Sequence, residues 1–350
     1  MPASNPNSPD SLHRQTSALE ARLRTLPKAE IHLHIEGSSD AATLKQLAMH
    51  AGEPMPRPRD KLLEFASLTD FLHFLDWACG LIRTPAQLAE IAHALSRRLA
   101  ASGTGYADAI INPAHWRHWH GRLPEMVTAL DAGFTAAERE GLPPLDLCIS
   151  LLRTASAEAA AQLLDELIAL RHPRVVALSI DGNEATAGRT GPRFAEVFRR
   201  AGEAGFKRTV HAGDSSGPEG VRDAMELLGA DRIDHGVRAT EDPVLVALLA
   251  KRKIPLGVCP GSKLALGVYP SMTEHPLDQL RLAGVPVSVN TDDPADPALF
   301  GTTLEHEYAR CVEAYGWNDE IIRSVAHTSI DASFASAEVK ARLLGSLAVW

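Results

Sequence analysis

Two histidines separated by one residue, His32 and His34, stand in a short apolar run, Glu30–His34, that is typical of a strand. Side chains two positions apart on a strand point to the same side, so both imidazoles would face one space. Such a pair can bind a metal ion, or it can be two hydrogen-bonded histidines of a protein interior. The pair alone leaves both interpretations open.

Three other expected strand ends carry groups of the same kind. His211 ends the run Arg-Thr-Val-His, His235 ends Arg-Ile-Asp-His, and Asp292 and Asp293 follow Val-Ser-Val-Asn-Thr. Imidazole nitrogens and carboxylate oxygens are ligands of Zn²⁺, which keeps a position open for water in catalytic sites. The expected ligands of one metal are His32, His34, His211 and Asp292.

A bound zinc ion would lower the pKa of its water from 15.7 to about 7. His235 and Asp293, which are not in the ligand set, are candidates to accept the proton of that water. Binuclear barrel hydrolases commonly bridge two metals with a modified lysine on the fourth strand. The fourth expected strand, Val175–Ile180, contains no lysine. One metal per chain is therefore expected.

The segments that must position these groups alternate between short apolar runs and longer stretches of helical periodicity. Eight βα units favour a closed α/β fold, the TIM (β/α)₈ barrel, over an open doubly wound sheet, and catalytic groups of such barrels collect at the C-terminal strand ends. No G-x-G-x-x-G follows the first strand, which disfavours dinucleotide binding. The expected strands are Glu30–His34, Tyr106–Ile111, Asp146–Leu152, Val175–Ile180, Arg208–Ala212, Arg232–His235, Ile254–Val258 and Val285–Asn290.

The connection between the first two strands, residues 35–105, is much longer than the others and predicts a helical insertion over the C-terminal mouth of the barrel. Its aromatic residues are expected to form a small core of its own, with the alternative that one or two of them wall a flat apolar pocket. These aromatic residues are Phe65, Phe71, Phe74 and Trp77. The expected helices are Leu62–Ala66, Asp70–Ile82 and Pro85–Ala101 in the insertion, and Ser17–Leu26, Ser156–Leu170, Phe194–Gly205 and Glu219–Leu228 elsewhere.

Composition limits the function classes. The chain has 350 residues, of which 45% are hydrophobic and 23% charged, and a net charge of −9 that argues against nucleic acid or an anionic membrane as partner. No apolar run reaches the about 18 residues of a membrane span, and the start lacks the apolar stretch of a signal peptide, so a cytoplasmic protein is expected. The four cysteines form no C-x-x-C, which disfavours a disulfide framework. We expect a disordered tail over residues 1–16 and a single barrel domain over 17–350, and a homo-oligomer is compatible with the sequence.

Five segments stand in order at 26–38 (LPKAEIHLHIEGS), 210–213 (VHAG), 232–236 (RIDHG), 259–262 (CPGS) and 290–294 (NTDDP). Together they resemble the adenosine deaminase family, which includes adenine deaminases and other aminopurine aminohydrolases. The resemblance covers residues 24–340 and implies a TIM barrel with one Zn²⁺ on the four ligands named above. It implies a small-molecule purine substrate and hydrolytic deamination of a 6-aminopurine, from adenosine or adenine to inosine or hypoxanthine, with release of ammonia.

The resemblance also implies roles for other residues. His235 would orient or deprotonate the attacking water, Asp214 would protonate purine N1, and Asp293 would hydrogen-bond N7. Gly182 would meet N3 through its backbone N–H, where a close approach favours glycine. Contacts to the substrate are also expected from His34, Glu36 and Arg153, although Arg153 can equally form a salt bridge at the rim.

One departure from the family pattern concerns the acid. The family normally has Glu after His-Ala-Gly, whereas this chain has Asp214, which is one methylene shorter. A misplacement near 1 Å can cost on the order of a hundredfold in rate. Three interpretations stay open: the barrel mouth shifts so that Asp214 still reaches N1, the substrate is a different heterocycle with an altered role for Asp214, or the protein is a purine-binding pseudoenzyme of low activity.

The substrate signals conflict. Glu36 in Glu36-Gly37 resembles the base deaminases, whereas Gly182 favours a nucleoside, because adenine deaminases tend to have Ser-Ser there. Both substrates are retained. Glu184 is a candidate to pair polar ring or sugar atoms, or to cap the next helix.

Three further positions have an ordinary interpretation beside a functional one. The second strand, with Tyr106 and Asp108, keeps an acid but lacks the family's Arg. In the loop 112–120, Trp116 and Trp119 are expected to be tucked indoles, with ring stacking or a histidine contact to substrate as the alternative. Lys263, where the family often has Asn, is expected to be solvated.

Overall fold

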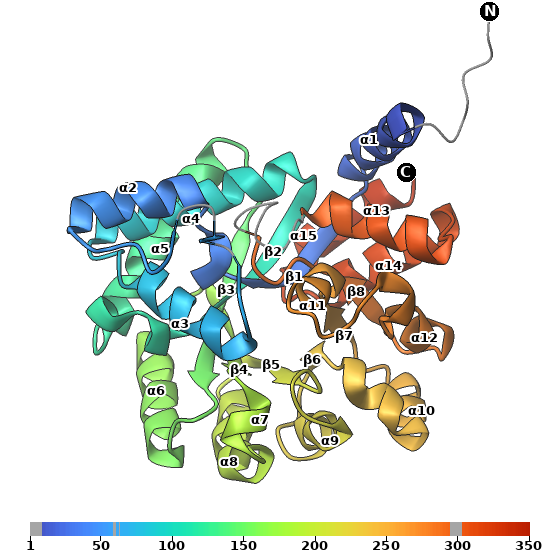
Figure 1. Cartoon of the computed structure of the whole chain (residues 1–350). Helices are drawn as coiled ribbons and strands as arrows, with labels where there is room; N and C mark the ends of the chain where they lie inside the picture. The colour runs from blue at the N-terminus through green and yellow to red at the C-terminus, as the bar shows by residue number, and fades with distance from the viewer. Residues whose placement is uncertain (1–8, 59–60, 63, 295–302) are drawn as a thin grey trace, which may run out of the picture.

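The computed structural model describes residues 9–58, 61–62, 64–294 and 303–350. Its centre is a sheet of eight parallel strands in the order β1 to β8, surrounded by helices (Figure 1). The strands are β1 Lys28–His34, β2 Thr104–Ile111, β3 Leu145–Leu152, β4 Val175–Asp181, β5 Lys207–Ala212, β6 Arg232–His235, β7 Leu256–Val258 and β8 Val287–Val289. All eight predicted strands are confirmed, with shifts at their ends.

The last two strands are shorter than predicted. β7 and β8 have three residues each and begin directly after Pro255 and Pro286. Proline has no N–H to donate to a neighbouring strand, so each ladder begins at the next residue. Both proline carbonyls still accept hydrogen bonds, from Ile233 at 3.0 Å and from Leu256 at 2.9 Å.

The sheet closes where β1 meets the chain that follows β8. Leu33 forms a parallel bridge with Asp292. The N–H of Ile31 donates to the side-chain oxygen of Asn290 at 2.9 Å. These contacts complete the barrel, so the predicted (β/α)₈ fold is confirmed.

The helices alternate with the strands along the chain. Among the described residues, no helix combines the length and apolar character needed to cross a membrane. The α-helices of the described residues are α1 Pro9–Arg24, α2 Ala41–Ala51, α3 Leu68–Cys79, α4 Pro85–Ala101, α5 Leu123–Arg139, α6 Ala157–Leu170, α7 Glu184–Ala187, α8 Gly191–Glu203, α9 Pro218–Glu226, α10 Pro243–Arg252, α11 Pro260–Ala265, α12 Leu277–Leu282, α13 Leu304–Tyr315, α14 Asp319–Ala332 and α15 Ala337–Leu347.

Most helix predictions hold, with two differences. The described residues of Leu62–Ala66 form no α-helix, so that prediction is wrong. Ser67 instead caps α3 by accepting from the N–H of Asp70, and the helix starts there. At the N-terminus α1 begins at Pro9, within the range 1–16 expected to be a disordered tail, and residues 1–8 lie outside the described part.

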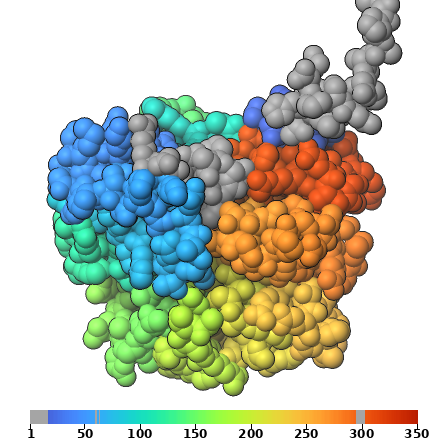
Figure 2. Space-filling view, in the orientation of Figure 1, coloured from blue at the N-terminus to red at the C-terminus, as the bar shows by residue number. Residues whose placement is uncertain are grey.

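The insertion between β1 and β2 carries α2, α3 and α4. Phe71 and Phe74 are buried in a small cluster with Phe65 and Trp77 packed against it, which confirms the predicted core. Leu266, which follows α11, also packs on this cluster. In Figure 2 the blue surface of the insertion accordingly lies beside the orange surface of the α11 region, across the centre of the molecule.

Candidate metal centre and active site

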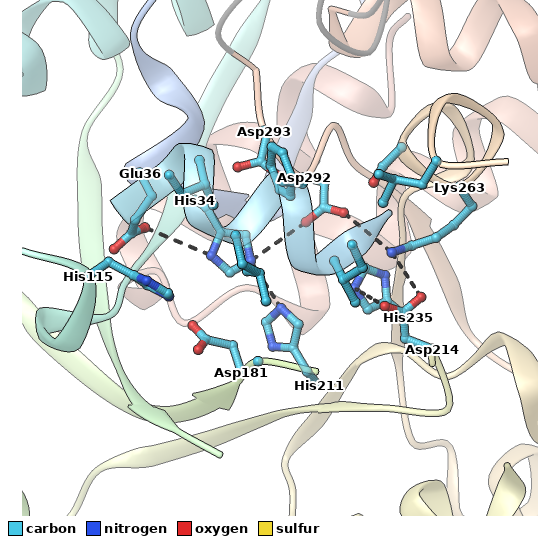
Figure 3. A pocket seen from close by; sticks show the side chains of 17 residues that line it. His34, Glu36, His115, Asp181, His211, Asp214, His235, Lys263, Asp292 and Asp293 are labelled. Atoms are coloured by element: carbon cyan, nitrogen blue, oxygen red, sulfur yellow. Dashed lines mark hydrogen bonds and ion pairs between the residues drawn. The ribbon is translucent and has the colours of Figure 1, made fainter. Parts of the chain in front are cut away.

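One pocket at the C-terminal ends of the strands collects most of the expected site residues (Figure 3). Active sites of (β/α)₈ enzymes are built at this end of the barrel. Its apolar wall consists of Leu68, Phe71, Leu72 and Leu75 from α3 and of Leu266. Its other lining residues are His34, Glu36, His115, Asp181, Gly182, His211, Asp214, His235, Ser262, Lys263, Asp292 and Asp293.

Four side chains converge at this pocket in an arrangement that fits a zinc ion. His32, His34, His211 and Asp292 each offer one ligand atom, and these atoms all lie within 4.8 Å of one another. The Nε2 atoms of His34 and His211 are 3.0 Å apart, and Asp292 Oδ1 lies 3.2 Å from His32 Nε2. Ligands about 2.0–2.1 Å from a tetrahedral ion stand about 3.3 Å apart, so the donor set matches Zn²⁺ in type and spacing.

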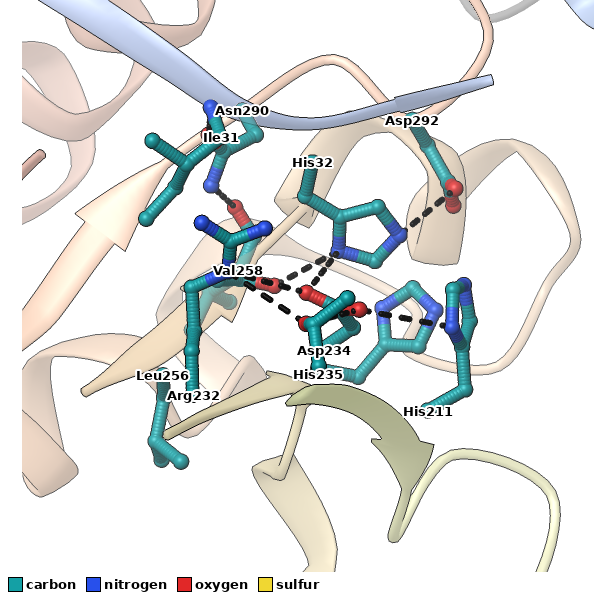
Figure 4. Close-up of polar contacts among 12 residues, drawn as sticks. Ile31, His32, His211, Arg232, Asp234, His235, Leu256, Val258, Asn290 and Asp292 are labelled. Carbon is teal, nitrogen blue, oxygen red and sulfur yellow. Dashed lines mark hydrogen bonds and ion pairs between the residues drawn. The ribbon is translucent and has the colours of Figure 1, made fainter. Parts of the chain in front are cut away.

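The outer ring nitrogens of His32 and His211 contact protein groups (Figure 4). His32 Nδ1 lies 2.9 Å from the carbonyl oxygen of Gly257, so Nδ1 carries the proton and Nε2 is free for a metal. Within the described residues His32 Nε2 has no hydrogen-bond partner. His211 Nδ1 lies 3.5 Å from Asp234 Oδ2. Contacts of this kind orient metal-binding histidines.

A buried charge network lies below the candidate metal ligands. Thr209 donates to Asp234 Oδ2 at 2.5 Å, and Arg232 Nε lies 3.5 Å from Asp234 Oδ1. Arg232 Nη1 also pairs with Asp108 at 2.7 Å, and Asp108 accepts from the Tyr106 hydroxyl at 2.7 Å. Arg232 of β6 therefore supplies the cation that β2 lacks.

Two residues of the site have an unusual backbone. Among the described non-glycine residues, His235 has φ of 68° and Asp292 has φ of 71°. L-residues rarely adopt this left-handed conformation, and such strain concentrates at functional sites. In both cases it occurs where a strand ends and the side chain turns into the pocket.

Burial favours the neutral form of two site histidines, His211 and His235. Burial, followed by the neighbouring imidazoles, lowers the pKa of His211 well below its ordinary value. Burial and then Lys263 lower the pKa of His235 in the same way. Neutral imidazole binds metals and accepts protons. A second donor group replaces His34 and His211 with His235 and Cys259. Three of the four residues of the first donor set line the pocket, compared with two of the second, so the first set is favoured.

Asp214 and Lys263 form an ion pair inside the pocket. Lys263 Nζ lies 2.8 Å from Asp214 Oδ1, and the two side chains are only 3% and 14% exposed. The expectation that Lys263 is solvated is therefore wrong. Burial alone would raise the pKa of Asp214, but Lys263 and His235 lower it below the ordinary value.

Asp293 lies on another side of the pocket and has the opposite character. Burial, followed by the charges of Asp292 and Glu36, raises the pKa of Asp293 well above its ordinary range. A neutral carboxyl group can donate a hydrogen bond to a ring nitrogen. A Cβ at Gly37 would collide with the Asp293 carboxyl group, so glycine in Glu-Gly leaves room for this side chain.

Glu36 is fixed by the loop after β2. Its Oε1 accepts from the N–H of Asn112 at 2.7 Å and from Trp116 Nε1 at 2.8 Å. Trp119 Nε1 donates to the carbonyl oxygen of Ile82 at 2.9 Å. Both indoles are buried and neither lines this pocket, which confirms the prediction that the two tryptophans are tucked into the protein.

His115 is the member of this loop that reaches the pocket. Its Nδ1 lies 2.6 Å from Asp76 Oδ1 on α3. Burial would lower its pKa, but the bond to Asp76 and the charges of Asp181 and Glu36 raise the pKa to about 9. The sequence pointed to this loop as a whole, but only the fold selects His115 among its three histidines.

Gly182 lines the pocket, whereas its neighbour Arg153 lies behind it. Gly182 lines the pocket with φ of 99°, a conformation open to glycine. Arg153 is buried beside it and donates to the carbonyl oxygens of Gly182 and His211 and to Thr190. Arg153 does not line this pocket, so these contacts support the backbone at the candidate ligand His211.

Glu184 holds the loop that carries Asp214. Its Oε1 accepts from the N–H of Gly213 at 3.1 Å. Its Oε2 accepts from the N–H groups of Asp214 at 2.8 Å, Ser215 at 3.2 Å and Ser216 at 3.3 Å. The carboxylate therefore caps this loop rather than the next helix.

The comparisons with known proteins agree with this geometry. The family profile described as adenosine deaminase matches residues 27–350. The aminodeoxyfutalosine deaminase of Streptomyces coelicolor is 35% identical, over 93% of this chain and 84% of its own. The adenine deaminase of Sinorhizobium fredii is 34% identical, over 93% and 99%. The structure of a Burkholderia ambifaria amidohydrolase with bound Zn superposes with a TM-score of 0.85 at 26% identity, over 94% of this chain and 92% of its own. The chain therefore belongs to the adenosine deaminase family, whose members are hydrolases acting on C–N bonds.

Proposed function

We propose that the protein is a zinc-dependent deaminase of a 6-aminopurine, with one Zn²⁺ per chain on His32, His34, His211 and Asp292. The observation that carries this proposal is the convergence of three imidazole nitrogens and one carboxylate oxygen within 4.8 Å at the pocket. When bound, zinc supplies an activated water at neutral pH. We propose that residues 17–350 act as one catalytic domain.

The residues around this centre can bind and orient a flat ring. Neutral His235 is assigned the role of proton acceptor beside the metal ligands. Asp214 is assigned the N1 side of the purine, Asp293 the N7 side through its retained proton, and the N–H of Gly182 the N3 side. The apolar wall from α3, with Phe71, would exclude water from the ring, which strengthens these polar contacts.

Adenine and a nucleoside-like 6-aminopurine are both retained as substrates. The relative named adenine deaminase supports the free base. The relative named aminodeoxyfutalosine deaminase, of similar identity, supports the second candidate. His34, Glu36 and, outside the family motifs, His115 are assigned contacts to the part of the substrate beyond the ring.

The test is ammonia release by purified, zinc-replete protein from adenine, adenosine, 2′-deoxyadenosine, aminodeoxyfutalosine and ring-altered analogues. Rapid release from one of these would support the assignment and identify the substrate. No release from any of them, with one zinc bound per chain, would contradict 6-aminopurine deamination. The alternatives of another heterocycle or a low-activity purine-binding protein would then apply.

A further inference from the structure

Two residues that depart from the family pattern touch each other in the pocket. Asp214 stands where a longer acid is usual, and Lys263 stands where a neutral amide is common. Lys263 Nζ lies 2.8 Å from Asp214 Oδ1, and both side chains are largely buried. A shorter acid is thus matched by a longer cationic side chain at the same place. The two substitutions form one contact and are interpreted together.

The surroundings of the ammonium group leave it a donor for a ligand. Lys263 Nζ also lies 3.8 Å from Asp292 Oδ2, so carboxylates face it on two sides. An ammonium group has three N–H donors. Lys263 lines the pocket together with Asp214 (Figure 3), so an N–H that is not directed at a carboxylate can face a ligand there.

The direction of hydrogen bonding decides which of the two side chains can bind purine N1. In the contact at 2.8 Å, Lys263 donates and Asp214 accepts. The ring nitrogen next to the amino-bearing carbon of a 6-aminopurine is an acceptor, so it needs a donor from the protein. The long stem of Lys263 compensates for the methylene that Asp214 lacks.

We propose that Lys263 and Asp214 act as one substrate-recognition unit, in which the Lys263 ammonium donates the hydrogen bond to purine N1 and Asp214 holds the ammonium in place. The inference rests on the proposed function, because it names the N1 partner of the same site. Lys263 is a substrate-binding residue in this scheme, and Asp214 is a positioning residue. The opposite view is that Lys263 only neutralises the carboxylates around it.

The decisive experiment compares binding of two ligands that differ at one ring atom. Purine and 1-deazapurine, in which a C–H replaces N1, are titrated into zinc-loaded wild type and Lys263→Met, and the exposed Lys251→Met serves as control. We expect Lys263→Met to weaken the binding of purine about tenfold and that of 1-deazapurine less than about twofold. Only purine would lose a charge-assisted hydrogen bond at N1. Equal weakening of both ligands, or no binding of either to wild type, would overturn the proposal. Zinc content measured on each protein separates this effect from metal loss.

A second experiment tests whether the two residues act as a unit. Asp214→Glu, Lys263→Asn and the double variant are compared by kcat and KM for the substrate that wild type uses. Each single change should lower kcat/KM at least about tenfold, and the double variant should recover most of the loss, because contacting residues couple strongly. Independent, multiplying losses would contradict the unit. A wild type that deaminates no 6-aminopurine refutes the proposed function, whereas the binding comparison still decides whether Lys263 contacts N1.

Discussion

The backbone of His34 donates to that of Asp292: the N–H of His34 lies 2.7 Å from the carbonyl oxygen of Asp292. The N–H of Asp292 in turn donates to the carbonyl oxygen of His32 at 3.2 Å. These two bonds close the barrel between its first and last strands and set the Asp292 carboxylate beside the imidazoles. The candidate metal ligands are therefore positioned by main-chain bonds, which do not depend on their side chains.

Because main-chain bonds hold the backbone of Asp292, the variant Asp292→Asn should change the ligand side chain and leave the barrel closed. Asn tolerates the left-handed backbone at this position, but its neutral amide is a poor ligand for Zn²⁺. We expect zinc content to fall from one per chain to well below half, and ammonia release to fall at least about a hundredfold. Metal analysis and kinetics measure both. In the presence of a chelator the melting temperature should match that of metal-free wild type, and full zinc occupancy would contradict the ligand assignment.

Asp234 is predicted to act on the metal through His211. Replacing Asp234 with Asn removes the charge beside His211 Nδ1, and the loss of such a contact typically weakens metal affinity about 10–100-fold. Competition with a chromogenic zinc chelator measures this affinity. The matched control is Asp231→Asn, which changes a partly exposed aspartate that is paired with Arg208 and lies directly before β6. Equal affinities for the two variants would exclude this role of Asp234.

The fold and the residues of the candidate metal site could be picked out from the sequence because both leave short-range signals. Alternating strand and helix patterns identified the eight strands, and the ligands lie at or just after the ends of three of them. The burial of Lys263 could not be predicted, since lysine side chains are usually exposed to solvent. Its partner Asp214 lies far away in sequence, and only the closed barrel brings the two together.

The sequence was enough to predict that Asp234 and Arg232 face the same side of their strand. Asp234 and Arg232 are two residues apart on β6 and so share one face of the strand. Charged residues that face a barrel interior need partners, but only the structure identifies Asp108 as the partner of Arg232. Conversely, Arg153 lies at a strand end and matches the family pattern, yet its contacts are to backbone carbonyls. Sequence position alone did not distinguish support of the site from contact with the substrate.

Glu184 is predicted to control the loop that carries Asp214. Glu184→Ala leaves the N–H groups of residues 213–216 without their acceptor, and each buried unsatisfied donor costs about 1–3 kcal/mol. We expect a loss of about 2–4 kcal/mol in the free energy of unfolding and a kcat at least about tenfold lower, with zinc retained. Chemical denaturation and kinetics measure the two effects. The exposed Glu219→Ala serves as control, and an unchanged stability would show that the loop does not need this carboxylate.

His115 is predicted to make the stability of the protein depend on pH. Its pKa in the folded protein, about 9, lies above its ordinary value of 6.5. The protonated ring therefore stabilises the fold fully below about pH 6.5, and this contribution is lost as the pH rises through about 9. Because Asp76 is 53% exposed and screened, we expect a contribution of about 2 kcal/mol. The free energy of unfolding of wild type minus that of His115→Gln should be largest at pH 6 and small above pH 9.5. The exposed His50→Gln should show no such change, and a difference for His115→Gln that stays constant with pH would contradict the ion pair with Asp76.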